Sequence, residues 1–131
     1  MSYAAIRSRY VSDAVSTASP AALLIMLYDR LLLDLERGEA LITSGDRIGA
    51  SSELMHAQEI IMEFRMSLDV ESWEGGAGLE SLYSFLYSEL VRANTTGDAA
   101  AVQACRKLVL PLRNSWLEAA EAVNAALVPK T

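Results

Sequence analysis

Four long stretches of this sequence carry apolar residues at steps of three and four positions, and this spacing limits the fold more than any other feature. In the first stretch Leu24, Leu31 and Leu35 recur in this way, which places them on one face of an α-helix. The spacing predicts one helix that begins at residues 19–20 and ends at 43–46, and three more over about 46–69, 77–95 and 99–126.

Local signals at the ends of these stretches agree with helices. Ser19 can cap the first helix, and Pro20 suits its first turn because the nitrogen there needs no hydrogen-bond partner. Asp98 can cap the last helix in the same way. No run of alternating β-branched residues competes with this pattern. Four helices joined by short loops predict an all-α protein: an antiparallel up-down four-helix bundle over residues 19–128, with an N-terminal arm over residues 1–18.

The apolar stripe of each helix is the predicted core. On the last helix that stripe is Ala101, Cys105, Leu108, Leu112, Trp116, Ala119 and Val123. A glycine pair and a proline are expected to disturb the helices. Gly75 and Gly76 predict a hinge before the third helix. Pro111 predicts a kink in the fourth, because proline removes one backbone donor.

Charge and cysteine content exclude several classes of protein. The chain of 131 residues has a net charge of −6, which argues against nucleic acid or an anionic membrane surface as the primary partner. Its longest apolar run, residues 21–28, is far shorter than the about 20 residues that span a bilayer. A single cysteine cannot form an internal disulfide, and the N-terminus lacks a signal-peptide pattern, so we expect a cytosolic protein without membrane insertion.

Catalytic and metal-binding motifs are incomplete. Glu53 and His56 have the Glu-x-x-His spacing of a di-metal site, but such a site needs two histidines and the chain has one. We therefore expect His56 to be a solvated surface residue. Cys105 falls on the core stripe, where a free cysteine acts as a small apolar side chain. We expect no enzyme activity, no metal site and no cofactor.

The second predicted helix has more apolar residues than one bundle face requires. At about 100° per residue, Met55, Met62 and Met66 fall within about 40° of one another and about 140° from the core stripe. Phe85 is a similar surplus residue on the third helix. Two interpretations stand: these residues pack against neighbouring helices in a flattened bundle, or they line a groove for an amphipathic helix of another chain. Methionine suits such a groove because its flexible side chain adapts to varied surfaces.

The N-terminal arm carries spaced apolar residues that suit the same groove. Ile6, Tyr10 and Val15 stand among polar residues before the bundle begins. A tethered segment of this kind can cover an apolar surface until a partner displaces it. The predicted partner-binding residues are therefore Ile6, Tyr10, Val15, Met55, Met62, Met66 and Phe85.

A series of short motifs runs along about residues 10–120 in one order. Residues 17–29 read TASPAALLIMLYD, and the later segments are LMHAQEIIMEFRMSLD at 54–69, LESLYSFLYSELVRAN at 79–94 and LPLRNSW at 110–116. Together with Tyr10 and Gly75-Gly76, these segments resemble the FliS family of flagellar export chaperones. Arg30 departs from the family pattern, which often has glycine after Tyr-Asp, and Pro111 interrupts the last helix where a helix former is expected.

This resemblance implies a function. Members of the family are antiparallel helical bundles that bind the disordered C-terminal segment of flagellin in the cytosol, prevent its premature polymerisation and keep it competent for export. The residues alone leave a second class open, a self-associating helical adaptor or scaffold with no flagellin binding. They also leave open a contact with the flagellar export apparatus, and a monomeric or homodimeric state.

Overall fold

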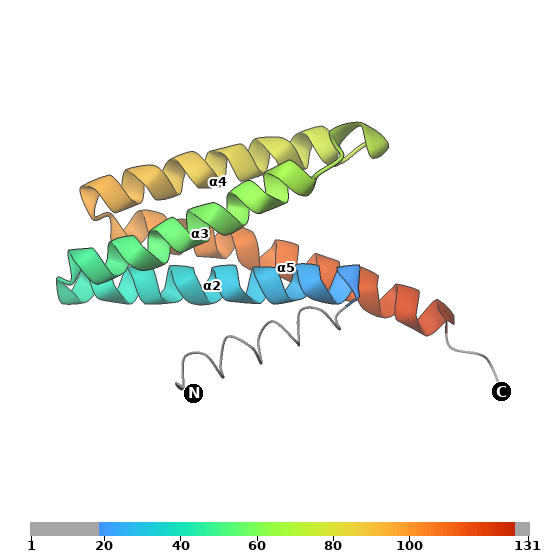
Figure 1. Cartoon of the computed structure of the whole chain (residues 1–131), viewed down its shortest axis with the longest axis horizontal. Coiled ribbons are helices and arrows are strands. Elements are labelled where there is room, and N and C mark those ends of the chain that lie inside the picture. Colours follow the sequence, from blue (N-terminus) through green and yellow to red (C-terminus); the bar gives the residue numbers. More distant parts are fainter. Residues whose placement is uncertain (1–18, 128–131) are drawn as a thin grey trace, which may run out of the picture.

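The computed structural model describes the backbone of residues 19–127 and the side chains of residues 19–123. It contains four long helices, α2 (Pro20–Ser44), α3 (Arg47–Ser67), α4 (Gly76–Thr96) and α5 (Ala99–Leu127), and the short 3-10 helix η1 (Val70–Ser72) between α3 and α4. Figure 1 shows them packed as one bundle, with α5 extending past the start of α2. The predicted all-α four-helix bundle is confirmed, and residues 19–127 contain no strand. The predicted arm, residues 1–18, lies outside the described residues, so the division into arm and bundle stays a prediction.

Side-chain caps define where three of the helices begin. The Ser19 hydroxyl accepts a hydrogen bond at 3.1 Å from the backbone N–H three residues later, at the start of α2. The carboxylates of Asp46 and Asp98 do the same for α3 at 2.8 Å and for α5 at 3.1 Å. Such caps satisfy backbone donors that the first helical turn leaves free. The helix starts that the sequence predicts at Ser19 and Asp98 therefore have the expected local cause.

The helices pack around a square, with α2 against α3 and α5, and α4 against α3 and α5. Two ion pairs join α2 to α5 in opposite chain order: Asp29 to Arg113 at 2.8 Å, and Glu39 to Arg106 at 3.1 Å. This reversed order makes α2 and α5 antiparallel.

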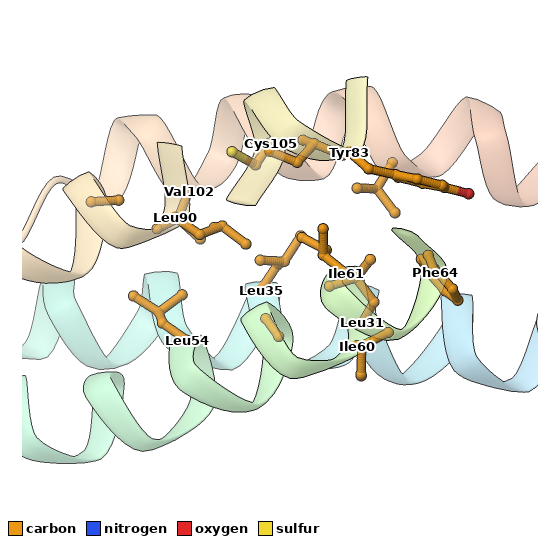
Figure 2. Close-up of a cluster of buried hydrophobic side chains, with 14 of the residues drawn as sticks. Leu31, Leu35, Leu54, Ile60, Ile61, Phe64, Tyr83, Leu90, Val102 and Cys105 are labelled. Atoms are coloured by element: carbon orange, nitrogen blue, oxygen red, sulfur yellow. The ribbon is translucent and has the colours of Figure 1, made fainter. Parts of the chain in front are cut away.

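One buried cluster draws side chains from all four helices, as Figure 2 shows. On α2 the predicted stripe residues Leu31 and Leu35 are buried, and Leu24 packs against the cluster. The larger buried members of the cluster include Tyr28, Leu31, Leu35, Leu54, Ile61, Phe64, Tyr83, Leu86, Leu90, Val102 and Val109. Burial of this apolar surface is the main favourable contribution to folding.

The predicted stripe of the last helix is wrong in three places. Leu108 is 41% exposed, Val123 is 59% exposed and Ala119 is exposed as well, whereas Val102 and Val109 are fully buried. On α5 the next buried residue after Cys105 follows four positions later rather than three. Val109 therefore points into the core, and Leu108 points to the side. Val123 lies in the last turns of α5, which ends at Leu127. The helix continues through Pro111 to Leu127, and the predicted kink there stays a prediction.

The glycine pair before α4 has a packing role that the hinge prediction missed. Gly76 is buried and begins α4, and a Cβ atom there would lie 2.2 Å from the carbonyl oxygen of Val70. Because such a contact is impossible, only glycine lets the loop that contains η1 approach α4 so closely. The third predicted helix therefore starts one residue earlier than expected, at a close contact between backbones.

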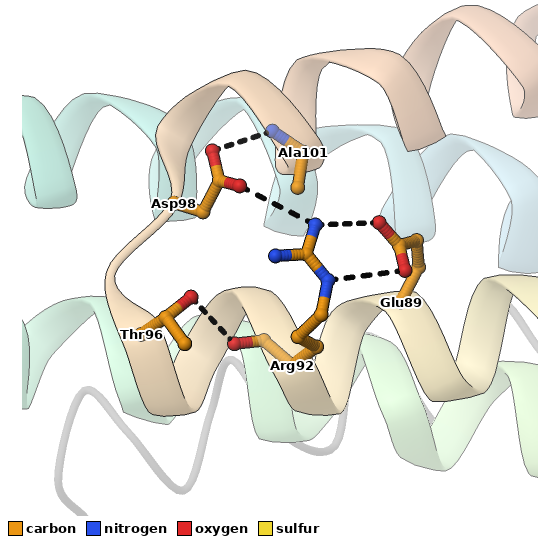
Figure 3. A network of polar contacts seen from close by, with 5 residues as sticks. All are labelled: Glu89, Arg92, Thr96, Asp98 and Ala101. Carbon is orange, nitrogen blue, oxygen red and sulfur yellow. Dashed lines mark hydrogen bonds and ion pairs between the residues drawn. The ribbon is translucent and has the colours of Figure 1, made fainter.

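A polar network joins the end of α4 to the start of α5 (Figure 3). Arg92 contacts Glu89 at 2.6 Å and Asp98 at 3.3 Å, while Asp98 also caps α5. The hydrogen bond from Arg92 lowers the pKa of the Glu89 carboxyl. Within residues 19–127, no helix combines the length and the apolar character needed to cross a membrane.

Candidate partner-binding surface

The three methionines of α3 line one surface hollow of about 330 Å³. Met55 is 55% exposed and Met66 is 76% exposed, while Met62 between them is half-buried. We call this feature the methionine hollow; its lining is Met55, Gln58, Glu59, Met62, Glu63, Met66 and Tyr87. An exposed apolar hollow with a polar rim is the usual form of a partner-binding site.

The hollow exists because α3 is apolar on two faces. Leu54, Ala57 and Ile61 are fully buried against the other helices, and the methionines project from a different side of the same helix. The structure therefore leaves Met55 and Met66 outside the core, as the groove interpretation requires. That these side chains bind a partner stays a prediction.

The residue of α4 that lines the methionine hollow is Tyr87, which was not among the predicted partner-binding residues. Phe85 is 52% exposed but is not among the residues that line the hollow. The positions of Tyr87 and Phe85 around the helix could have shown which of the two faces the hollow. Tyr87 follows the buried Tyr83 by four residues and so shares its side of α4, whereas Phe85 follows it by two and points elsewhere.

The thiol of Cys105 is buried in the core. Burial raises the pKa of the Cys105 thiol to about 11, so the thiol stays protonated near neutral pH. Among residues 19–127, no three His, Cys, Asp or Glu side chains are grouped so that they could hold a metal ion. The methionine hollow itself contains carboxylates and an amide beside its methionines, a composition suited to binding a protein surface.

Comparison with known proteins places this bundle in a family. Residues 2–123 match the family model described as Flagellar protein FliS.

The chain belongs to the FliS family.

Relatives named Flagellar secretion chaperone FliS are similar over most of their length. The Escherichia coli (strain K12) protein is 34% identical over 110 residues, which cover 82% of this chain and 81% of that protein. The Salmonella typhimurium protein is 31% identical over 108 residues, covering 81% and 80%, and the Bacillus subtilis (strain 168) protein is 29% identical over 110 residues, covering 84% and 82%. The predicted membership of the FliS family is thus confirmed.

In this FliS-family chain, Arg30 pairs with a buried carboxylate while its own side chain stays partly exposed. Asp34 on α2 is fully buried, and its carboxylate lies 3.0 Å from Nε of Arg30. Nδ1 of His56 on α3 hydrogen-bonds the other carboxylate oxygen. His56 is therefore not simply a solvated surface residue as expected. It links α3 to α2, and with Arg30 it compensates the cost of burying Asp34.

Three of the predicted partner-binding residues, Ile6, Tyr10 and Val15, lie outside the described residues. The remaining four are all at least partly accessible, and three of them meet in the methionine hollow.

Proposed function

We infer that this FliS-family chain is a flagellar secretion chaperone that binds the C-terminal segment of flagellin in the cytosol. In this role it prevents premature polymerisation of flagellin and keeps it competent for export. The single observation that carries the inference is the methionine hollow, an apolar site on the outer side of α3 in a chain of this family. The names of the three relatives, each a flagellar secretion chaperone, support the same role.

The spacing of the methionines suits a helical guest. Met55 and Met66 are eleven residues apart on α3, a rise of about 16 Å along the helix axis. A guest helix of about three turns therefore covers all three methionines with apolar residues at steps of three and four. A disordered segment that folds on binding has an ordering cost of about 2–5 kcal/mol, and the apolar surface of the hollow helps to offset it.

Phe85 and the N-terminal arm extend this binding surface. Phe85 presents a half-exposed ring on α4 outside the hollow, where it contacts a second part of a guest that continues around the bundle. Ile6, Tyr10 and Val15 cover the apolar surface until flagellin displaces the arm. Deleting residues 2–15 tests the cover: it should change the affinity for flagellin or the thermal stability. Unchanged values of both would show that the arm covers nothing.

The role requires binding rather than catalysis. Release of the guest follows when the flagellar export apparatus pulls on it, so neither a nucleotide nor another cofactor takes part. The net charge of −6 disfavours nucleic acid as a partner, because binding to phosphates requires positive charge.

Calorimetric titration of the full chain with a flagellin C-terminal peptide tests the function. We expect binding near one-to-one with a negative heat-capacity change, because the hollow and the guest bury apolar surface against each other. Absence of heat at micromolar concentrations, together with concentration-dependent self-association, would instead identify a self-associating helical adaptor. Sedimentation of the chain alone at the same concentrations supplies that second measurement.

A further inference from the structure

A small apolar cavity lies at the end of the bundle where α3 meets the loop before α4. Its volume is about 180 Å³, similar to the about 150 Å³ of an apolar protein cavity that takes up benzene. All four long helices and the loop contribute to its lining, which includes Leu24, Phe64, Leu68, Trp73, Tyr83 and Trp116. We call it the aromatic cavity. It shares no residue with the methionine hollow.

The core holds the inner wall of the aromatic cavity in place. Phe64 is 4% exposed and Tyr83 is 3% exposed, and the centroids of their rings lie 5.5 Å apart. Trp116 is half-buried, and its indole Nε1 donates a hydrogen bond at 3.2 Å to the hydroxyl of Tyr28. A flat ring packs well against fixed aromatic side chains of this kind.

Trp73 forms the outer wall of the cavity. It is 47% exposed, and a Cβ atom at Gly75 would collide with its ring. Glycine at position 75 therefore lets the indole lie close against the backbone of the loop. A ligand can enter the cavity by moving this one half-exposed side chain, without disturbing the core.

The hydrogen bonds of the inner wall leave one donor over. Trp116 donates to the Tyr28 hydroxyl, whose oxygen lies 2.6 Å from the hydroxyl oxygen of Tyr83. Burial raises the pKa of both tyrosine hydroxyls, so each keeps its proton near neutral pH. Only one of these two protons can lie between the two oxygens. No other hydrogen bond joins either hydroxyl to a residue in the described part of the chain, so the second proton lacks an acceptor there.

The proton left over is assigned to Tyr83 by burial. If Tyr83 donated to Tyr28, the proton of Tyr28 would have no acceptor in a side chain with no exposed surface that does not line the cavity. If Tyr28 donates instead, the remaining proton belongs to Tyr83, which does line the cavity. This second arrangement is favoured because a buried donor without room for an acceptor is costly. Figure 2 shows Tyr83 extending toward the end of the bundle near Phe64, where the cavity lies.

The other polar side chains of the cavity favour a neutral acceptor on the ligand. The hydroxyl of Ser72 donates to the backbone carbonyl of Asp69 at 2.8 Å, and that of Ser67 donates to Glu63 at 3.5 Å, so both of these protons have acceptors. The Asp69 side chain also lines the cavity, and no lysine or arginine of the described residues does. A negatively charged ligand is therefore disfavoured, and a carbonyl oxygen suits the Tyr83 proton.

We propose that the aromatic cavity binds a small neutral molecule, a single flat ring that carries a carbonyl group, and that the carbonyl oxygen accepts the hydroxyl proton of Tyr83. The volume limits the ligand to about one ring, the aromatic walls select a flat one, and Tyr83 selects the acceptor. The cavity is separate from the methionine hollow, so the inference goes beyond the binding of flagellin and does not depend on it.

Nuclear magnetic resonance of the full chain reports on the cavity directly. Trp73 and Trp116 are the two tryptophans of the chain, and both line the cavity, so their indole N–H signals respond to a ligand there. The probe is acetophenone, a benzene ring with a methyl ketone. Isopropenylbenzene has the same shape with a methylene group in place of the carbonyl oxygen, and it is the matched control ligand. Titration with either ligand should shift both indole signals saturably.

A pair of tyrosine variants tests the hydrogen bond. Tyr83→Phe removes the donor, and Tyr87→Phe makes the same change at a tyrosine of α4 that does not line the cavity. Tyr83→Phe should weaken acetophenone by about fivefold or more and change the affinity for isopropenylbenzene by less than about twofold, because only acetophenone carries an acceptor. Tyr87→Phe should affect neither ligand. Circular dichroism confirms that each variant is folded.

Met62→Glu separates this proposal from the proposed function. It places a charge in the methionine hollow, outside the aromatic cavity, and should leave the affinity for acetophenone unchanged. Failure of flagellin binding at the hollow and failure of ligand binding in the cavity are therefore distinct results.

Three results would overturn the proposal. The first is no saturable shift of the indole signals up to the solubility limit of acetophenone. The second is an effect of Tyr83→Phe that is equal for the two ligands or absent for acetophenone. The third is binding of acetophenone that begins only after residues 2–15 are deleted, which would assign the cavity to the N-terminal arm.

Discussion

The hydroxyl oxygens of Tyr28 and Tyr83 lie 2.6 Å apart in the core, and Trp116 donates to the same Tyr28 hydroxyl. The ring of Tyr28 also stacks on Phe64, with ring centroids 4.5 Å apart. One aromatic group thus joins α2, α3, α4 and α5. Buried hydroxyl and indole groups need hydrogen-bond partners, and here they supply them to one another. The tyrosine of the Met-Leu-Tyr-Asp motif therefore maintains the bundle itself and holds the indole of Trp116 in place.

This arrangement predicts a ranking of two tyrosine variants. Tyr28→Phe leaves both Tyr83 and Trp116 without their partner, whereas Tyr83→Phe removes one hydrogen bond and leaves Trp116 bonded to Tyr28. We expect Tyr83→Phe to lower the free energy of unfolding by about 1 kcal/mol and Tyr28→Phe by about 2 kcal/mol. Urea unfolding of the two variants and the wild type measures both values. A larger loss for Tyr83→Phe would contradict the network.

Stability should fall at alkaline pH because of Cys105. Burial raises the pKa of its thiol to about 11, above the about 8.5 of an exposed thiol. Between these values the unfolded state binds fewer protons than the folded state, so the free energy of unfolding falls as pH rises. We expect the thiol's contribution to be complete below about pH 8.5 and a loss of about 3 kcal/mol by about pH 11.

Urea unfolding across this pH range measures the loss, and Cys105→Ala is the comparison. Burial raises the pKa values of Tyr28 and Tyr83 as well, so part of the decline above about pH 10 persists in the variant. The decline between about pH 8.5 and 10 should be shallower without the thiol. Identical pH profiles for the two proteins would show that Cys105 is not the cause.

The first turn of α4 should tolerate alanine at one glycine and not at another. A Cβ atom at Gly76 would collide with the Val70 carbonyl, while one at Gly78 would meet nothing within 4 Å. We expect Gly76→Ala to lower the free energy of unfolding by about 1–3 kcal/mol through backbone displacement. Gly78→Ala in the first turn of α4 should raise it by about 0.5–1 kcal/mol, because alanine favours the helix. Thermal unfolding of both variants gives the comparison; equal behaviour would be inconsistent with the close contact.

Asp98 combines two roles that substitution can separate. It caps α5 through a backbone N–H at 3.1 Å and contacts Arg92 at 3.3 Å. Asp98→Ala removes both contacts and should cost about 1 kcal/mol of unfolding free energy. Asp98→Asn keeps a capping oxygen and loses only the exposed ion pair. It should therefore lower the free energy of unfolding by only about 0.3 kcal/mol. Chemical unfolding should therefore place the asparagine variant close to the wild type; a loss as large as that of alanine would make the ion pair the main contribution.

Helical periodicity was enough to predict the bundle, because each helix has one dominant apolar stripe and recognisable caps at Ser19 and Asp98. It also placed Met55 and Met66 away from the core stripe, since their angle around α3 depends only on local geometry. It left open whether they pack against neighbouring helices or face a partner. The choice between Leu108 and Val109 was not local. Both are apolar neighbours on α5, and the position of α4 and α2 around that helix decides which one is buried.

Contacts between distant residues could not be read from the sequence. His56 resembled a surface residue until the fold placed Asp34 beside it, twenty-two positions earlier in the chain. Two cavities that share Leu24 and Trp116 likewise combine the start of α2, the loop before α4 and the far half of α5. Periodicity describes each helix alone, so it shows the methionines of α3 but not surfaces that three separate segments form together.

The most direct test of the central claim is calorimetric titration of a flagellin C-terminal peptide into methionine variants. Met62→Glu and the more exposed Met66→Glu place a charge in the methionine hollow, and Ile48→Glu makes the same change at an 88% exposed residue of α3 outside the hollow. Circular dichroism first establishes that each variant is folded. We predict that both methionine variants lose binding by about tenfold or more while Ile48→Glu binds like the wild type. Wild-type affinity in folded Met62→Glu and Met66→Glu would contradict the claim that flagellin binds at this hollow.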